Sequence, residues 1–223
     1  MIPLRDNNPS RTFPFVNYML IVVNVIVFLY EVSVGRHLSE FIREFGLVPE
    51  RFISSLHAGY FGPDTFSPFL TSMFLHGGWL HLLGNMLFLF IFGDNVEDKF
   101  GHGRYLAFYF MAGLAAAAVQ VHFNKESTLP MVGASGAIAG VLGAYVLMFP
   151  TAKVLTLIPI FIFLKFVELP AFIFLGLWFL MQVFSGVLSL GIGADAGGVA
   201  WWAHIGGFAM GALSVPIFKK GGR

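Results

Sequence analysis

Three polar groups stand inside apolar stretches of the sequence, and together they carry the side chains that acyl transfer needs. Ser135 lies in a Gly-Ala-Ser-Gly stretch (133–136), and His204 lies in an Ala-His-Ile-Gly-Gly stretch (203–207). A histidine beside a serine takes the hydroxyl proton, and the alkoxide then attacks a carbonyl carbon. His81 and Asn85 are four residues apart, so on a helix they share one face and can stabilise the developing oxyanion.

The third member of a catalytic triad is missing from this pattern. The twelve acidic residues fall in loops or at the ends of apolar stretches, and Asp195 is the nearest of them before His204. The sequence therefore predicts a Ser–His dyad, in which a group other than a carboxylate orients His204.

The composition indicates that these residues belong to a helical membrane protein. Of the 223 residues 57% are apolar and 11% are charged, with a net charge of +1 and no cysteine. Soluble domains have roughly a quarter charged residues, so a soluble protein, a disordered chain and a nucleic-acid binder are excluded. The apolar runs are continuous, whereas the strands of a membrane β-barrel alternate. Without cysteine there is no disulfide, thiolate metal site or cysteine nucleophile.

The apolar runs predict an all-α membrane protein with six transmembrane helices in one domain (1–223). The expected spans are 15–32, 74–92, 105–123, 131–149, 170–190 and 199–218. A cleaved signal peptide is the alternative interpretation of the first run. Residues 33–70 have apolar side chains at helical spacing among charges, which predicts an interfacial loop of short amphipathic helices. Residues 154–167 are interrupted by Pro159 and Lys165, so we expect an interfacial or re-entrant segment there.

The span limits place the polar groups at one depth. With a rise of about 1.5 Å per residue, Ser135 and His204 lie about 21 Å and His81 about 18 Å from the inner ends of their spans. This level is about 10 Å below the outer surface of a bilayer about 30 Å thick. Gly136, Gly140 and Gly143, with Gly207 and Gly211, form small-residue strips that allow close approach of spans four and six.

The distribution of basic residues predicts the orientation. One side of a six-span topology holds nine Lys and Arg: Arg5, Arg11, Lys99, Arg104, Lys153, Lys165, Lys219, Lys220 and Arg223. The other side holds four: Arg36, Arg43, Arg51 and Lys125. The positive-inside rule then places both termini in the cytoplasm and the protein in the cytoplasmic membrane as a multi-pass protein.

The ordered set of motifs resembles the rhomboid family of intramembrane serine proteases. The resemblance rests on the two stretches around Ser135 and His204, on His-Gly-Gly-Trp-Leu-His-Leu-Leu-Gly-Asn at 76–85, and on Gly-Asp-Asn-Val-Glu at 93–97. It extends from about Phe69 to Gly211. One departure is Ala139, four residues after the serine, where relatives often place an aromatic residue against the histidine.

The resemblance implies a rhomboid-like bundle and a set of roles. Ser135 would be the nucleophile, His204 the general base and acid, and His81 with Asn85 the oxyanion stabilisers. The reaction would be cleavage of transmembrane helices near their extracytoplasmic ends, without metal or cofactor. Because a helical backbone is already hydrogen-bonded, we expect the partners to be transmembrane substrates in the lipid bilayer with helix-destabilising residues.

Other interpretations of the same residues stay open at this point. Ser135 alone is compatible with tight helix contact, His204 with a buried structural role and Asn85 with a hydrogen bond between helices. His76, His81 and His204 together could ligate zinc, although no carboxylate or cysteine accompanies them. A polytopic transporter and a non-catalytic rhomboid-like binder of membrane helices are the remaining alternatives.

Overall fold

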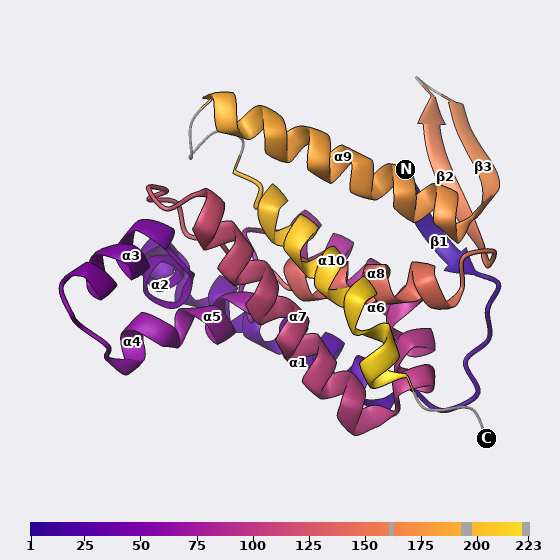
Figure 1. Cartoon of the computed structure of the whole chain (residues 1–223), viewed down its shortest axis with the longest axis horizontal. Coiled ribbons are helices and arrows are strands. Elements are labelled where there is room, and N and C mark those ends of the chain that lie inside the picture. Colours follow the sequence, from indigo (N-terminus) through magenta and orange to yellow (C-terminus); the bar gives the residue numbers. More distant parts are fainter. Residues whose placement is uncertain (161–162, 193–197, 220–223) are drawn as a thin grey trace.

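The computed structural model describes residues 1–160, 163–192 and 198–219, and it is mostly helical (Figure 1). Six long helices form its main body: α1 (Phe15–Val34), α6 (Trp79–Phe100), α7 (His102–Phe123), α8 (Ser135–Met148), α9 (Ala171–Ile192) and α10 (Trp201–Phe218). Each overlaps one of the ranges that the sequence predicts as spans. Asp195, Lys220 and Arg223, which entered the predictions above, lie outside the described residues.

Several of these helices have the length and composition of membrane spans. Among the described residues, Phe15–Phe45, Trp79–Phe100, His102–Phe123 and Ala171–Gly191 are long and apolar enough to cross a membrane. Helix α8 is apolar but has 14 residues, or about 21 Å of helix. Helix α10 has 18 residues and contains Pro216.

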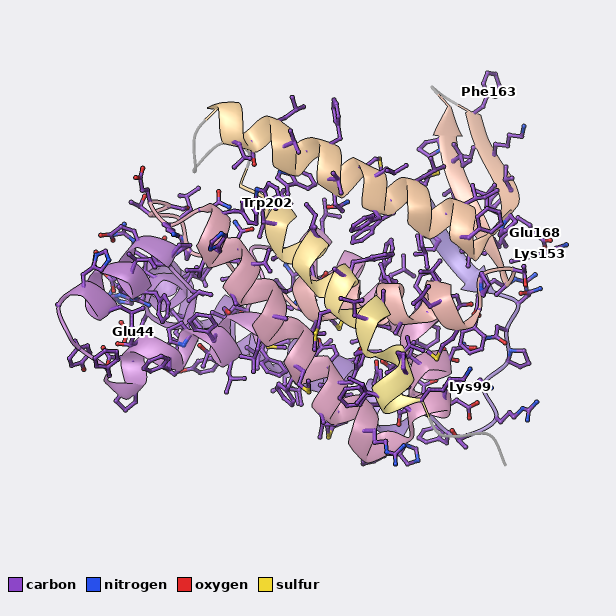
Figure 2. All side chains as sticks on the ribbon, in the orientation of Figure 1. Glu44, Lys99, Lys153, Phe163, Glu168 and Trp202 are labelled. Atoms are coloured by element: carbon purple, nitrogen blue, oxygen red, sulfur yellow. The ribbon has the colours of Figure 1, made fainter. Side chains whose placement is uncertain are left out.

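The expectation of an all-α protein is wrong, because the chain also forms a three-stranded antiparallel sheet. Its strands are β1 (Ile2–Asp6), β2 (Lys153–Ile160) and β3 (Phe163–Pro170), in the order β1-β2-β3. The described residues within 154–167 therefore belong to strands β2 and β3. Figure 2 shows Phe163 at the tip of the strands, and Lys153 and Glu168 close together away from that tip. The Lys153 Nζ and the Glu168 Oε2 form an ion pair at 3.4 Å. The pairing of β1 with β2 joins segments about 150 residues apart, which local sequence patterns do not reveal.

Helix α6 also differs from its predicted range, since it starts at Trp79 and continues seven residues past Gly93. Polar residues in the last two turns of α6 form hydrogen bonds with residues near the N-terminus, so the helix continues through this polar stretch. The buried Glu97 carboxylate accepts hydrogen bonds from the backbone N–H groups of Val16 and Asn17 at 3.0 and 2.7 Å. These N–H groups lie in the first turn of α1, where no carbonyl of the same helix can accept them.

Glycine brings α8 and α10 into close contact. A Cβ added at Gly207 would lie 2.0 Å from the carbonyl oxygen of Gly136, and one at Gly211 would lie 1.9 Å from that of Gly140. Only hydrogen fits at these positions. The small-residue strips thus lie against each other as the sequence predicts, and the residues next to them are brought together.

The region between α1 and α6 folds into short helices that gather at one end of the molecule (Figure 1). They are η1 (Gly35–His37), α2 (Leu38–Phe45), α3 (Pro49–His57), α4 (Pro63–Phe66), α5 (Pro68–Thr71) and η2 (Ser72–Phe74). Leu47 pairs with Met131, and the N–H of Gly133 donates to the carbonyl of Ser72 at 2.8 Å. This region therefore holds the loop that leads into Ser135.

Candidate active site

Ser135 is the first residue of α8. The preceding loop reaches it through Gly133, whose φ is 126°. Residues other than glycine rarely adopt this backbone conformation. A Cβ at Gly133 would also lie 2.8 Å from the ring of His81. As the first residue of a helix, Ser135 has a backbone N–H with no carbonyl to bond inside the helix, so this group can donate to a ligand.

His204 meets Ser135 across the contact between α8 and α10. The His204 Nε2 lies 2.8 Å from the Ser135 Oγ, a normal hydrogen-bond distance. Ser135 directly precedes Gly136, and His204 lies three residues before Gly207, so both side chains stand next to the glycine contact between the helices. Two side chains that are 69 residues apart in sequence thus form a nucleophile–base arrangement.

His81 and Asn85 lie on one face of α6, next to Gly133. The N–H of Gly77 donates to the His81 Nδ1 at 3.3 Å, so in neutral His81 the proton is on Nε2. The Asn85 Nδ2 is buried and has no hydrogen-bond partner among the described residues. Burying an amide donor without a partner is costly, which marks it as a group kept for a ligand.

A cavity of about 670 Å³ unites the four predicted residues. Ser135, His204, His81 and Asn85 all line it, and Trp178 of α9 lines it too. The remaining walls come from α6, from the loop before α8 and from the start of α10, where Figure 2 labels Trp202. The cavity is large enough for several residues of a peptide and for water, and it is mainly apolar with a few polar groups.

The sequence reasoning missed the residues of α9 that contact His204. The Gln182 Oε1 lies 2.8 Å from the His204 Nδ1, and the ring of Trp178 lies 5.8 Å from the imidazole between centroids. Gln182 is a polar side chain inside the apolar run 170–190, about 12 Å from its outer end at a helical rise. The same depth argument that selected Ser135 and His204 would have found it. Ala139 is buried in α8, and aromatic rings reach His204 from elsewhere: Trp178 of α9 and, at 6.3 Å between centroids, Trp201 of α10.

His76 and Glu31 support the site from outside it. The Glu31 carboxylate of α1, 1% exposed, accepts the backbone N–H of His76 through both oxygens at 3.2 and 3.1 Å. The His76 ring packs against the His81 ring with centroids 5.2 Å apart. The Glu31 hydrogen bonds hold the loop before α6, and the ring contact holds His81 against Gly133.

Comparison with known proteins identifies the family. The sequence model of the Rhomboid domain matches residues 63–220, which is more than half of the chain and includes all four predicted site residues. The chain belongs to the rhomboid family. Together with its apolar helices, this membership makes it a multi-pass membrane protein.

Individual rhomboid proteins are similar over parts of their length. The chain is 31% identical over 146 residues to Rhomboid protein 1, mitochondrial, of Saccharomyces cerevisiae, covering 64% of this chain and 39% of that protein. It is 33% identical over 132 residues to Rhomboid protease GluP of Bacillus subtilis, covering 59% and 24%. RHOMBOID-like protein 5 of Arabidopsis thaliana is 40% identical over 75 residues, covering 34% and 24%. The matches thus span about a quarter to two fifths of these relatives.

Proposed function

We propose that this rhomboid protein is an intramembrane serine endopeptidase with Ser135 as nucleophile and His204 as general base and acid. The observation that carries the proposal is the 2.8 Å contact between the Ser135 Oγ and the His204 Nε2 inside a cavity. A serine that served only to let helices approach would not need an imidazole at its hydroxyl. The similarity to a named rhomboid protease supports the same assignment.

The reaction follows from the positions of the donors and acceptors. The His204 Nε2 takes the proton of the Ser135 hydroxyl while Oγ bonds to the carbonyl carbon of the substrate, whose π electrons move to its oxygen. The N–H groups of the Asn85 Nδ2, the His81 Nε2 and the Ser135 backbone are the donors that would bind this oxyanion. The oxyanion then collapses and the C–N bond breaks as His204 gives its proton to the leaving amine, which leaves an acyl-enzyme. Water adds to this ester with His204 as base, and the C–Oγ bond breaks as His204 returns the proton to the Ser135 Oγ.

The substrate and the topology are part of this proposal. All six long helices cross the bilayer in it, residues 33–70 lie at its interface, and both termini are in the cytoplasm of a cell whose cytoplasmic membrane holds the protein. The substrates are transmembrane helices of other proteins, cut near their extracytoplasmic ends. A carbonyl in a helix is already hydrogen-bonded, so substrates with helix-destabilising residues are favoured.

The alternative functions fit the site less well. A zinc site would need free ring nitrogens, but both nitrogens of His204 face other groups, Ser135 and Gln182. Within the described ranges, no three His, Cys, Asp or Glu side chains come together as metal ligands would. A non-catalytic binder of membrane helices would have no use for an Asn85 amide that lines the same cavity as Ser135 and has no partner among the described residues.

Labelling with a serine-directed fluorophosphonate in detergent tests the proposal. We expect modification at Ser135, its loss in Ser135→Ala and His204→Ala, and no effect of a chelator. Ser214→Ala is the matched control, because Ser214 is a buried serine of α10 whose hydroxyl donates to the carbonyl of Gly211 in its own helix. Labelling that persists in His204→Ala at the wild-type rate, or proteolysis of a membrane substrate by Ser135→Ala, would refute the dyad.

A further inference from the structure

Helix α9 supplies contacts to His204 on the side of the ring away from Ser135. Gln182 reaches the Nδ1 with its Oε1 at 2.8 Å, and Trp178 places its ring at 5.8 Å and 37° to the imidazole. The two residues are four apart and so share a face of α9. Gln182 is 5% exposed, so water does not compete for its contact with His204.

The amide of Gln182 is held in one orientation by a second hydrogen bond. Its Nε2 donates to the backbone carbonyl of Trp178 at 3.2 Å. A carbonyl only accepts, so the NH₂ end of the amide must point to Trp178 and the oxygen must point to His204. The amide is therefore oriented by its own helix.

The orientation of the amide determines which nitrogen of the neutral His204 imidazole carries the proton. An amide oxygen cannot donate, so the His204 Nδ1 that faces it carries the proton. A neutral imidazole has one ring proton, which leaves a lone pair on Nε2, 2.8 Å from the Ser135 Oγ. This is the tautomer that can accept the serine proton.

We propose that Gln182 is a positioning residue that keeps neutral His204 protonated at Nδ1, in the place where a triad has its carboxylate. This inference rests on the proposed function of Ser135 and His204. An amide that replaces the carboxylate of a Ser–His–Asp triad lowers kcat about 10⁴-fold, because it holds the imidazole in the wrong tautomer. That penalty is avoided here because the NH₂ of Gln182 is engaged by the Trp178 carbonyl.

Two substitutions at position 182 separate this role from packing. Gln182→Met keeps the length of the side chain but replaces the amide with a thioether, a much weaker acceptor. We expect kcat on a reconstituted transmembrane substrate to fall about 10- to 100-fold with KM unchanged. Gln182→Glu restores an acceptor oxygen as a neutral carboxyl, whose O–H donates to the Trp178 carbonyl while its other oxygen faces His204, and we expect it to recover part of the loss. Met181→Leu is the matched control, because this neighbour on α9 is 49% exposed and lies outside the cavity lining.

The tautomer itself is measured by ¹⁵N NMR of labelled histidine, with His204→Ala assigning the signal. We expect Nδ1 protonation in the wild type and a shift of population toward Nε2 protonation in Gln182→Met. Wild-type kcat in Gln182→Met, an unchanged tautomer in that variant, or Gln182→Glu as slow as Gln182→Met would each overturn the inference. The NMR result does not require proteolysis, so it decides the role of Gln182 even if an active Ser135→Ala variant refutes the proposed function.

Discussion

The contact between α8 and α10 provides a direct test of how the fold places the nucleophile beside its base. In Gly207→Ala the new methyl group would lie 2.0 Å from the Gly136 carbonyl oxygen. Carbon and oxygen need about 3.0–3.4 Å, so the helices must separate locally by about 1.0–1.4 Å. The Ser135–His204 contact of 2.8 Å would then lengthen to about 3.8–4.2 Å, which is no longer a hydrogen bond.

We expect this separation to slow the reaction about 100-fold or more, because a misplacement of about 1 Å commonly costs that much. The rate of fluorophosphonate labelling at Ser135 and kcat on a reconstituted substrate measure it. Overpacking of this kind also lowers the free energy of unfolding by about 1–3 kcal/mol, so thermal unfolding in detergent is recorded in parallel.

Gly176→Ala is the control for this experiment. Gly176 lies in α9, and a Cβ there would meet nothing within 4 Å. Alanine at that position stabilises a helix by about 0.5–1 kcal/mol relative to glycine, so we expect activity to stay and stability to rise slightly. If Gly207→Ala labels and unfolds like the wild type, the glycine contact does not set the distance between Ser135 and His204.

Three further substitutions test other parts of the structure. Asn85→Ala should lower kcat about 10²- to 10³-fold with little change in stability, and an unchanged kcat would remove Asn85 from the oxyanion site. Glu31→Ala leaves the His76 N–H without its acceptor and should lower the free energy of unfolding by about 1–3 kcal/mol in a denaturant titration; equal midpoints would contradict this. Burial raises the pKa of Asp6 from 3.8 to about 6. The protonated carboxyl therefore stabilises the folded state fully below pH 3.8, and this contribution is lost as the pH rises through 6. The melting temperature of the wild type should therefore fall relative to Asp6→Asn over that range, and parallel curves would show that Asp6 does not titrate there.

The proximity of Ser135 and His204 was easier to predict from the sequence than the three-stranded sheet. Ser135 and His204 could be paired because helical rise converts sequence position into depth, and polar side chains at membrane depth need a reason. The sheet was missed because β1 pairs with β2 across most of the chain, and no local pattern marks such a pair. The extension of α6 was missed for the same reason, since the partners of Glu97 are backbone groups at the start of α1.

The sequence predicts that a group other than a carboxylate orients His204, but it does not identify this group as Gln182, because the two residues lie on different helices. The buried carboxylates of this chain show why none stands there. Glu97 is held by two N–H groups in the first turn of α1, and Glu31 by the N–H of a loop residue before α6. Such donors are free only where a helix begins or the chain is irregular.

Gln182 lies in the middle of α9, where the backbone N–H groups are engaged within the helix. A carboxylate at that point would have His204 as its only partner, and its charge would be buried without further donors, which is costly in an apolar environment. An amide is neutral, and the Trp178 carbonyl satisfies its second end. A glutamine at position 182 can therefore orient His204 without burying a charge.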